Sequence, residues 1–201
     1  MGENICIFGA SIIWGAWDHE QGGWVNRLRL FVESYNSEIL TYNLGISGDT
    51  TTGLLKRFDL EVKTRNPKII IFSIGINDSI LIKSENKNIV PIDKFEDNVQ
   101  KLIDKAREYS QKIVFVSFNC VDEFKTSPIP WQKDFYYINK NIKLYNQKIK
   151  EITSKNNVYY LDVFDLLSNE DLEDGLHPNS IGHKKLFLKI KDFLIENKLL
   201  D

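Results

Sequence analysis

Residues that could carry out chemistry follow apolar runs of this sequence, at the points where those runs end. Ser11 follows the first run, Gly45 closes the second and Asn77 follows the third, while Asp174 and His177 precede the last helical pattern. Together they offer the hydroxyl of a serine, the backbone N–H of a glycine, a carboxamide, and a carboxylate with an imidazole. Acyl transfer needs these groups: a nucleophile, oxyanion donors, a base and an acid that orients the base.

The pair Asp174 and His177 is the most informative of these features. A separation of three residues brings both side chains to one side of a single turn, so the carboxylate can select the imidazole tautomer. The chain has two other histidines. We expect His183 to lie inside the last helix with a structural hydrogen bond, and His19 to lie in a solvated loop.

The elements that position these residues alternate along the chain. Five continuously apolar runs predict strands, at residues 5–8, 39–44, 68–74, 113–116 and 158–161. Between these runs, apolar residues recur at helical spacing, and Thr50, Asp93 and Ser180 are the predicted N-caps of three of the helices. Strands that are apolar throughout are typical of a parallel sheet covered on both faces. The sequence therefore predicts an α/β fold: a three-layer α/β/α sandwich with a five-stranded parallel sheet and flavodoxin-like topology.

In such a sheet, ligands bind beyond the carboxyl ends of the strands. The candidate residues should therefore meet at one edge. The segments 78–92 and 118–137 are irregular and longer than usual loops, which indicates a functional role. We expect the second to shape the substrate pocket, and Trp14, Trp17 and Trp131 are candidates to line it.

The composition excludes several classes of protein. The 201 residues favour a single domain over residues 1–201, and 26 basic against 28 acidic residues give no excess of positive charge for nucleic acid. No apolar stretch approaches the roughly 18 residues of a membrane span. Two cysteines, Cys6 and Cys120, form no disulfide framework, and the first residues lack a signal-peptide pattern, so we expect a cytoplasmic protein. Nothing in the sequence specifies an oligomeric state.

Four motif blocks carry a resemblance to a known family. They are Gly9-Ala10-Ser11, Asn43-Leu44-Gly45, Gly75-Ile76-Asn77-Asp78 and Asp174-Gly175-Leu176-His177-Pro178-Asn179. In this order the chain resembles the SGNH hydrolases, also called the GDSL esterase/lipase family, over nearly its whole length. The first block departs from the family pattern, which usually has Asp where this chain has Ala10.

The resemblance implies a serine esterase that acts on small carboxylic esters through an acyl-enzyme. Ser11 would be the nucleophile, His177 the base and Asp174 the acid that orients it. The backbone N–H groups of Ser11 and Gly45 and the amide of Asn77 would form the oxyanion hole. No metal and no cofactor is required. Without a carboxylate at Ala10, we expect another acid, Asp49 or Asp78, to support the serine turn.

Other interpretations stay open at this point. The same triad could transfer the acyl group to an alcohol, as an acyltransferase, or the fold could be a non-catalytic flavodoxin-like binding module. A metal site of Asp174, His177 and His183 lacks the i, i+4 histidine pair of a zinc helix. Cys120, near the end of the fourth strand, could be a nucleophile, but no histidine is indicated as its partner.

Overall fold

The centre of the molecule is a five-stranded parallel sheet. The computed structural model describes residues 4–200 of the chain. The strands are β1 (Asn4–Gly9), β2 (Thr41–Gly45), β3 (Pro67–Ser73), β6 (Lys112–Val116) and β8 (Tyr159–Leu161). They lie in the order β2-β1-β3-β6-β8, and every neighbouring pair is parallel. This is the flavodoxin-like order, with the topological switch point between β1 and β3, so the predicted sheet is confirmed.

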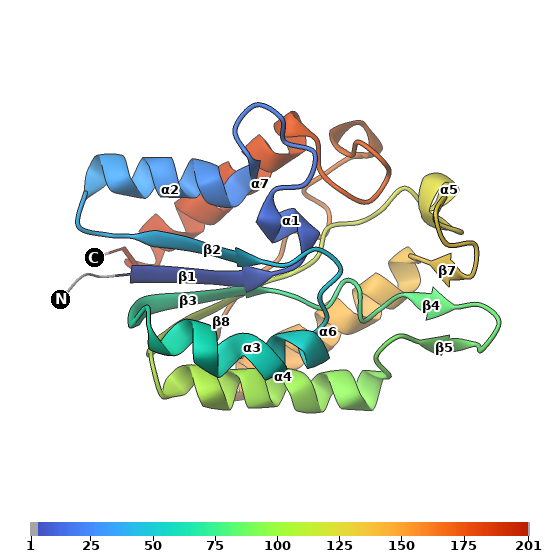
Figure 1. The fold of residues 1–201 in the computed structure, drawn as a ribbon, viewed down its shortest axis with the longest axis horizontal. Coiled ribbons are helices and arrows are strands. Elements are labelled where there is room, and N and C mark those ends of the chain that lie inside the picture. Colours follow the sequence, from blue (N-terminus) through green and yellow to red (C-terminus); the bar gives the residue numbers. More distant parts are fainter. Residues whose placement is uncertain (1–3, 201) are drawn as a thin grey trace.

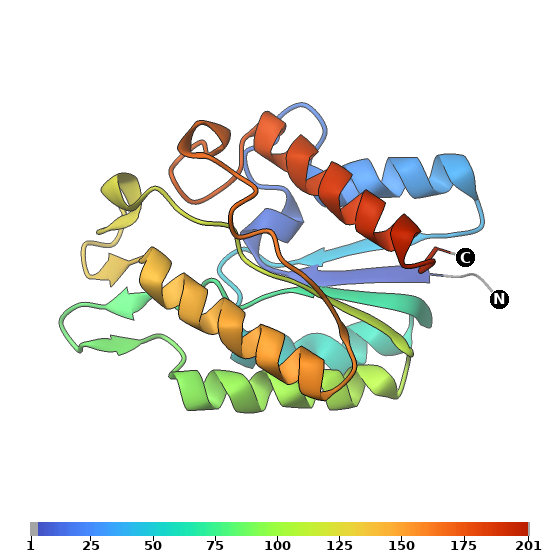
Figure 2. The same cartoon turned by 180° about the vertical axis from the view of Figure 1, so that it is seen from behind.

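Helices cover both faces of the sheet (Figures 1 and 2). One layer holds α2 (Gly23–Tyr35) and α7 (Ser180–Glu196), and the other holds α3 (Thr51–Lys63), α4 (Ile92–Arg107) and α6 (Asn139–Lys155). The remaining helices are short: α1 (Ser11–Trp14), α5 (Glu123–Thr126) and the 3₁₀ turn η1 (Asn169–Asp171). Among the residues that the structure describes, no helix combines the length and apolar character needed to cross a membrane.

Two hydrophobic clusters, one on each face of the sheet, form the core. Side chains alternate between them along each strand: Ile5 and Ile7 belong to one cluster, Cys6 and Phe8 to the other. Because both faces are buried, every position of such a strand must be apolar. This explains why the inner strands β1, β3 and β6 appear in the sequence as nearly continuous apolar runs, whereas the edge strands β2 and β8 are partly exposed.

The two long irregular segments contain short strands that pair with each other. β4 (Leu81–Ile82) lies between β5 (Lys87–Asn88) and β7 (Phe135–Tyr136) in an antiparallel sheet. Figure 1 shows this small sheet and α5 beyond the carboxyl ends of the strands. Strands of two residues leave no periodic pattern in a sequence.

Helix starts differ from the prediction at two positions. Thr50 caps α3 as expected, since its side chain accepts a hydrogen bond from Gly53 N–H at 3.2 Å. The cap of α7 is Asn179 instead of Ser180, because the Asn179 side chain accepts from the N–H groups of Ile181 and Gly182. The predicted cap Asp93 is also wrong, since α4 begins at Ile92 after Pro91 with no side-chain cap.

Candidate active site

Strands β1 and β2 end side by side and bring Ser11 to the edge of the sheet. Gly9 and Gly45 are partners in the ladder, and α1 starts two residues after Gly9. A side chain at Gly45 would place Cβ 2.3 Å from Trp14 N and 2.8 Å from Ala10 O. Because those atoms belong to the backbone, only glycine lets the serine helix α1 pack this closely against β2.

Ser11, His177 and Asp174 form one hydrogen-bonded chain. Ser11 Oγ lies 2.8 Å from His177 Nε2, and His177 Nδ1 lies 2.7 Å from Asp174 Oδ2. Burial by itself raises the pKa of Asp174, but hydrogen bonds from the side chain and backbone of His177 outweigh it and hold that pKa well below the usual range. An ionised carboxylate only accepts, so Nδ1 carries the imidazole proton and Nε2 is left to accept from the Ser11 hydroxyl.

The turn that carries the acid and the imidazole is held by the acid itself. Asp174 Oδ1 accepts hydrogen bonds from Leu176 N–H at 3.0 Å and His177 N–H at 2.8 Å. Gly175 adopts a left-handed φ of 88° within this turn. An aspartate that bonds to the backbone two and three residues ahead is typical of such turns. The sequence spacing of three thus gives the contact that it predicts.

The Asn77 side chain is buried and bonded at both ends of its amide. Its Nδ2 donates to Asp49 O at 2.8 Å, and its Oδ1 accepts from the Tyr137 hydroxyl at 2.6 Å. The tyrosine donor requires the oxygen on its own side, so the NH₂ group faces the other way. The bond to Asp49 uses one of the two N–H donors. Burial raises the pKa of Tyr137, so its hydroxyl stays neutral and able to donate.

Tyr137 is a supporting residue that sequence reasoning missed. It lies directly after β7, inside the segment 118–137. In the sequence, only the length and the aromatic content of this segment indicate a functional role for it. Trp131 of the same segment is 65% exposed and does not line the pocket of Ser11.

Gly45 already has a hydrogen-bond acceptor within its own segment. Its N–H donates to Asn43 Oδ1 at 3.0 Å, and Asn43 Nδ2 donates to Ile13 O at 2.7 Å. Asn43 therefore links β2 to α1. An oxyanion at this place would have to share the Gly45 N–H with Asn43 or displace its side chain.

The expectation that Asp49 or Asp78 replaces the missing carboxylate at Ala10 is wrong. Asp49 pairs with Arg57, with Oδ2 2.8 Å from Nη2. Asp78 accepts hydrogen bonds from the backbone and hydroxyl of Thr51. Ala10 is the N-cap of α1, and no side chain accepts the free N–H groups of that helix among the described residues.

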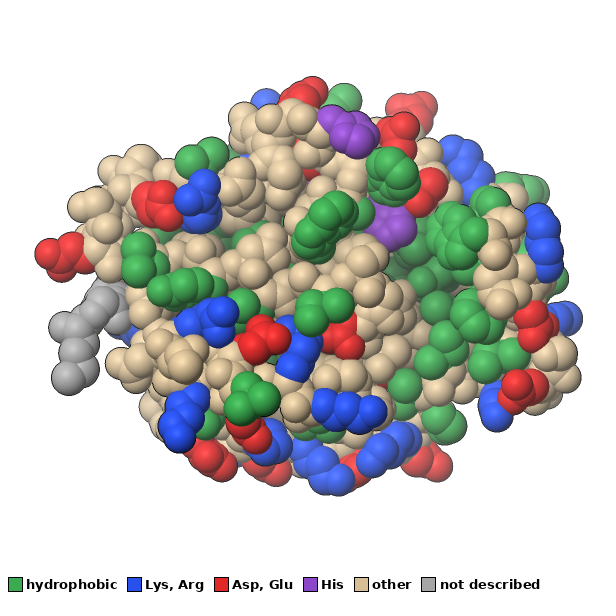
Figure 3. All heavy atoms as spheres, in the orientation of Figure 1, with side chains coloured by type: hydrophobic (Ala, Val, Ile, Leu, Met, Phe, Trp, Pro, Cys, Tyr) green, Lys and Arg blue, Asp and Glu red, His purple; other side chains and the backbone are tan. Residues whose placement is uncertain are grey.

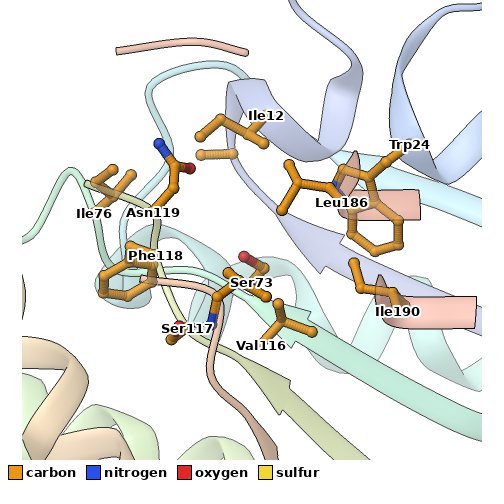
Figure 4. A pocket seen from close by; sticks show the side chains of 12 residues that line it. Ile12, Trp24, Ser73, Ile76, Val116, Ser117, Phe118, Asn119, Leu186 and Ile190 are labelled. Atoms are coloured by element: carbon orange, nitrogen blue, oxygen red, sulfur yellow. Dashed lines mark hydrogen bonds between the residues drawn. The ribbon is translucent and has the colours of Figure 1, made fainter. Parts of the chain in front are cut away.

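A small internal cavity lies behind Ala10. Its volume is about 20 Å³, and its wall includes Ala10, Ser73, Ser117 and Asn119. Figure 4 shows the polar residues Ser73, Ser117 and Asn119 within an otherwise apolar wall. A space of this size holds about one water molecule. The polar side chains that line this cavity together with Ala10 are therefore two serines and an asparagine.

Ser11 and His177 open into a second, larger pocket of about 550 Å³. Besides Ser47, its other residues come from the end of α1 and the loop that follows it: Trp14, Gly15, Ala16, Trp17, Asp18, His19 and Gly22. Figure 3 shows histidine side chains beside exposed apolar ones on this face. The expectation that Trp14 and Trp17 line a pocket is confirmed.

The remaining candidates have structural partners. His183 is buried; its Nδ1 accepts from Trp24 N–H at 3.1 Å and its Nε2 donates to Ala16 O at 2.9 Å, so the predicted structural role is confirmed. Because both nitrogens are engaged, His183 offers no lone pair to a metal ion. The Cys120 thiol donates to Leu167 O at 3.2 Å, and burial raises its pKa, both of which disfavour a nucleophilic thiolate.

Comparison with known proteins agrees with this geometry. Residues 7–185 match the GDSL-like lipase/acylhydrolase family. The chain is 31% identical over 120 residues to the uncharacterized lipoprotein YqeF of Bacillus subtilis, an alignment that covers 57% of this chain and 48% of that protein. It is 30% identical over 129 residues to a multidomain esterase of Ruminococcus flavefaciens, and this alignment covers 62% of this chain and 15% of that protein. The chain thus spans about half or less of the length of these two relatives.

The fold is similar to a solved structure, the lipase/acylhydrolase from Enterococcus faecalis. The TM-score is 0.78 at 22% identity, over 95% of this chain and 94% of that one. This similarity concerns the fold alone. The family match, in contrast, includes all four motif blocks in their order. The chain therefore belongs to the GDSL-like lipase/acylhydrolase family.

Proposed function

We propose that this protein hydrolyses carboxylic esters through an acyl-enzyme on Ser11. The observation that carries the proposal is the chain of hydrogen bonds from Ser11 Oγ through His177 to Asp174. Ser11 and His177 line the pocket of about 550 Å³. This volume suits a small molecule. The esterase among the relatives and the name of the family both support the same chemistry.

The proposed reaction has two halves. Ser11 Oγ attacks the ester carbonyl carbon while its proton moves to His177 Nε2, and Asp174 stabilises the imidazolium that forms. The tetrahedral intermediate then collapses, the bond to the alcohol oxygen breaks, and the alcohol takes the proton from Nε2. Water repeats the attack on the acyl-enzyme with the same proton transfers, releasing the acid and restoring Ser11.

The developing oxyanion needs donors that stand ready. The N–H of Ser11 is the first of α1 and has no partner within the helix. Asn77 Nδ2 retains one N–H beyond its bond to Asp49. We assign these two donors to the oxyanion, with Gly45 N–H as the third once Asn43 yields it. Each such donor is typically worth about 3–4 kcal/mol in the transition state.

Hydrolysis of p-nitrophenyl esters of increasing chain length tests the proposal. Ser11→Ala should lower kcat by at least about 10³-fold, because the attacking oxygen is gone. Ser47→Ala is a matched control, since Ser47 lines the same pocket and has no hydrogen bond to His177 among the described residues. Near wild-type turnover in Ser11→Ala would exclude the serine mechanism. Absence of hydrolysis of every ester by the unmodified protein would favour a non-catalytic binding module.

A further inference from the structure

Trp17 adopts a backbone conformation that tryptophan rarely tolerates. Its φ is 67°, in the left-handed region, which is costly for a bulky residue. Trp17 as a residue is 45% exposed at the wall of the pocket, so burial of the side chain does not explain the conformation. Another contact must account for it.

That contact is a hydrogen bond to the acid of the triad. Trp17 Nε1 donates to Asp174 Oδ2 at 3.0 Å. The same oxygen accepts from His177 Nδ1 at 2.7 Å, while Oδ1 accepts from two backbone N–H groups. The carboxylate thus receives four donors, which is about its full capacity. The indole supplies the only one of the four that comes from outside the turn 174–177.

The residues around Trp17 hold it in this place. Asp18 is buried and binds Arg27, with Oδ2 3.0 Å from Nη2, and accepts from the Ser180 hydroxyl at 2.8 Å. On the other side, Ala16 O accepts from His183 of α7 at 2.9 Å. The loop of Trp17 is therefore tied from both sides to the start of α7, directly after the turn that carries Asp174. Such surroundings can sustain local strain at a functional site.

We propose that Trp17 is a positioning residue for His177: the indole N–H and the imidazole N–H share Asp174 Oδ2, so Trp17 fixes the carboxylate and limits the negative charge that it presents to the imidazole. This inference rests on the proposed function. It makes one wall of the substrate pocket a support for the groups that relay the proton. The exposed neighbour Trp14 lines the same pocket, but its indole has no hydrogen-bond partner among residues 4–200.

The charged and titratable groups near Trp17 determine the direction of the expected effect. Asp174 and His177 face the indole N–H, and His19 packs against the ring with 5.9 Å between centroids. Asp18 is neutralised by Arg27. Without the indole N–H, Oδ2 carries more negative charge and stabilises the imidazolium, so the base loses its proton only at higher pH. In a plot of kcat/KM against pH, the midpoint of the acidic limb should therefore lie about 0.5 pH unit higher, which is the effect expected for the loss of one neutral donor to a carboxylate.

The experiment compares Trp17→Phe with Trp14→Phe. Both variants keep an aromatic ring and remove one indole N–H, but only Trp17→Phe removes a bond to Asp174. We expect the midpoint of the acidic limb of kcat/KM to lie at higher pH in Trp17→Phe and to stay unchanged in Trp14→Phe. If Trp17→Phe does not fold, Trp17→Gly replaces it, because glycine accepts a positive φ; the same upward shift is expected.

A second measurement does not depend on turnover. The NMR signals of the His177 ring, followed against pH in the resting protein, should titrate at higher pH in Trp17→Phe than in the unmodified protein. Equal midpoints by both methods would overturn the role of Trp17 while leaving the esterase proposal intact. Retained activity in Ser11→Ala would instead overturn the proposed function, and the NMR titration would still decide on Trp17.

Discussion

At the scale of single residues, the amide of Asn77 depends on a partner from a distant segment. The Tyr137 hydroxyl holds Oδ1, and this orients the Nδ2 donors away from the tyrosine. The catalytic contribution proposed for Asn77 therefore rests on two side chains, 60 residues apart in the sequence.

We expect Asn77→Ala to lower kcat by about 10²- to 10³-fold with little change in KM, because its bond to the substrate oxygen strengthens in the transition state. Tyr137→Phe keeps the amide but loses the bond that orients it. A neutral hydrogen bond is worth about 1 kcal/mol, so kcat should fall about five-fold. Steady-state kinetics on one ester measure both effects. A change confined to KM would make Asn77 a residue that positions substrate instead.

Asp78, next to Asn77, is a fully buried carboxyl with an unusual titration. Burial raises its pKa to about 6, against the hydrogen bonds from Thr51, which lower it, and the nearby charge of Asp49 raises it further. Because the folded-state pKa is raised, the folded protein binds this proton more tightly than the unfolded chain. Its contribution to stability is complete below the ordinary value of about 3.9 and is lost as pH rises through about 6.

Asp78→Asn should remove this pH dependence, since an amide keeps an acceptor for Thr51 and has no charge to bury. We expect the free energy of unfolding of the unmodified protein to fall relative to that of Asp78→Asn between about pH 4 and pH 6. Urea unfolding at several pH values measures the difference. A constant difference over this range would show that folding does not raise the pKa of Asp78.

At the scale of elements, the helix α1 is only four residues long and begins without a side-chain cap. Ala10 at the N-cap has no side-chain acceptor, and the residue lines the small cavity together with Ser73 and Asn119. An aspartate or asparagine there could accept from the free N–H groups of Ile12 or Ile13, which lie behind the N–H assigned to the oxyanion.

Ala10→Asp should therefore raise the free energy of unfolding by about 1 kcal/mol and leave Ser11 active, as substitutions toward a good N-cap do. Ala10→Asn is the matched control, because it offers the same acceptor without a charge. Stabilisation by Asn alone would mean that the cavity does not tolerate a buried carboxylate. Loss of stability in both variants would contradict the capping argument. Thermal unfolding and ester hydrolysis of the three proteins provide the comparison.

At the scale of the whole molecule, the two hydrophobic clusters share the same strands. Ile69 and Ile71 of β3 belong to one cluster, and Ile70 and Phe72 to the other. If the strands separate, both clusters lose side chains at once, so neither cluster can unfold while the other stays intact. We therefore propose that residues 1–201 form a single cooperative domain.

The unfolding transition should follow one curve with every probe. Far-UV circular dichroism reports the helices of both layers. Fluorescence of the buried Trp24, measured after the exposed Trp14, Trp17 and Trp131 are replaced by Phe, reports the layer of α2 and α7. Coincident midpoints in urea are expected for a two-state protein. Separate midpoints would show that one layer unfolds by itself.

The sequence by itself determined the large features of this protein. Unbroken apolar runs such as Ile69 to Phe72 require burial on both faces, and their alternation with helices permits few architectures other than a parallel sandwich. The four motif blocks, with Ser11, Asn77 and His177 in order, identified the family. The pair Asp174 and His177 was predictable because a contact over three residues depends on local backbone geometry.

Only the tertiary structure decided which distant groups support the site. Tyr137 on Asn77, Trp17 on Asp174 and the partners of Asp49 and Asp78 join segments far apart in the chain. The two-residue strands β4 and β7, which bring Tyr137 into place, have no pattern that a sequence could reveal. A single hydrogen bond between remote side chains leaves no periodic trace, because it depends on where the sheet, the helices and the loops finally pack.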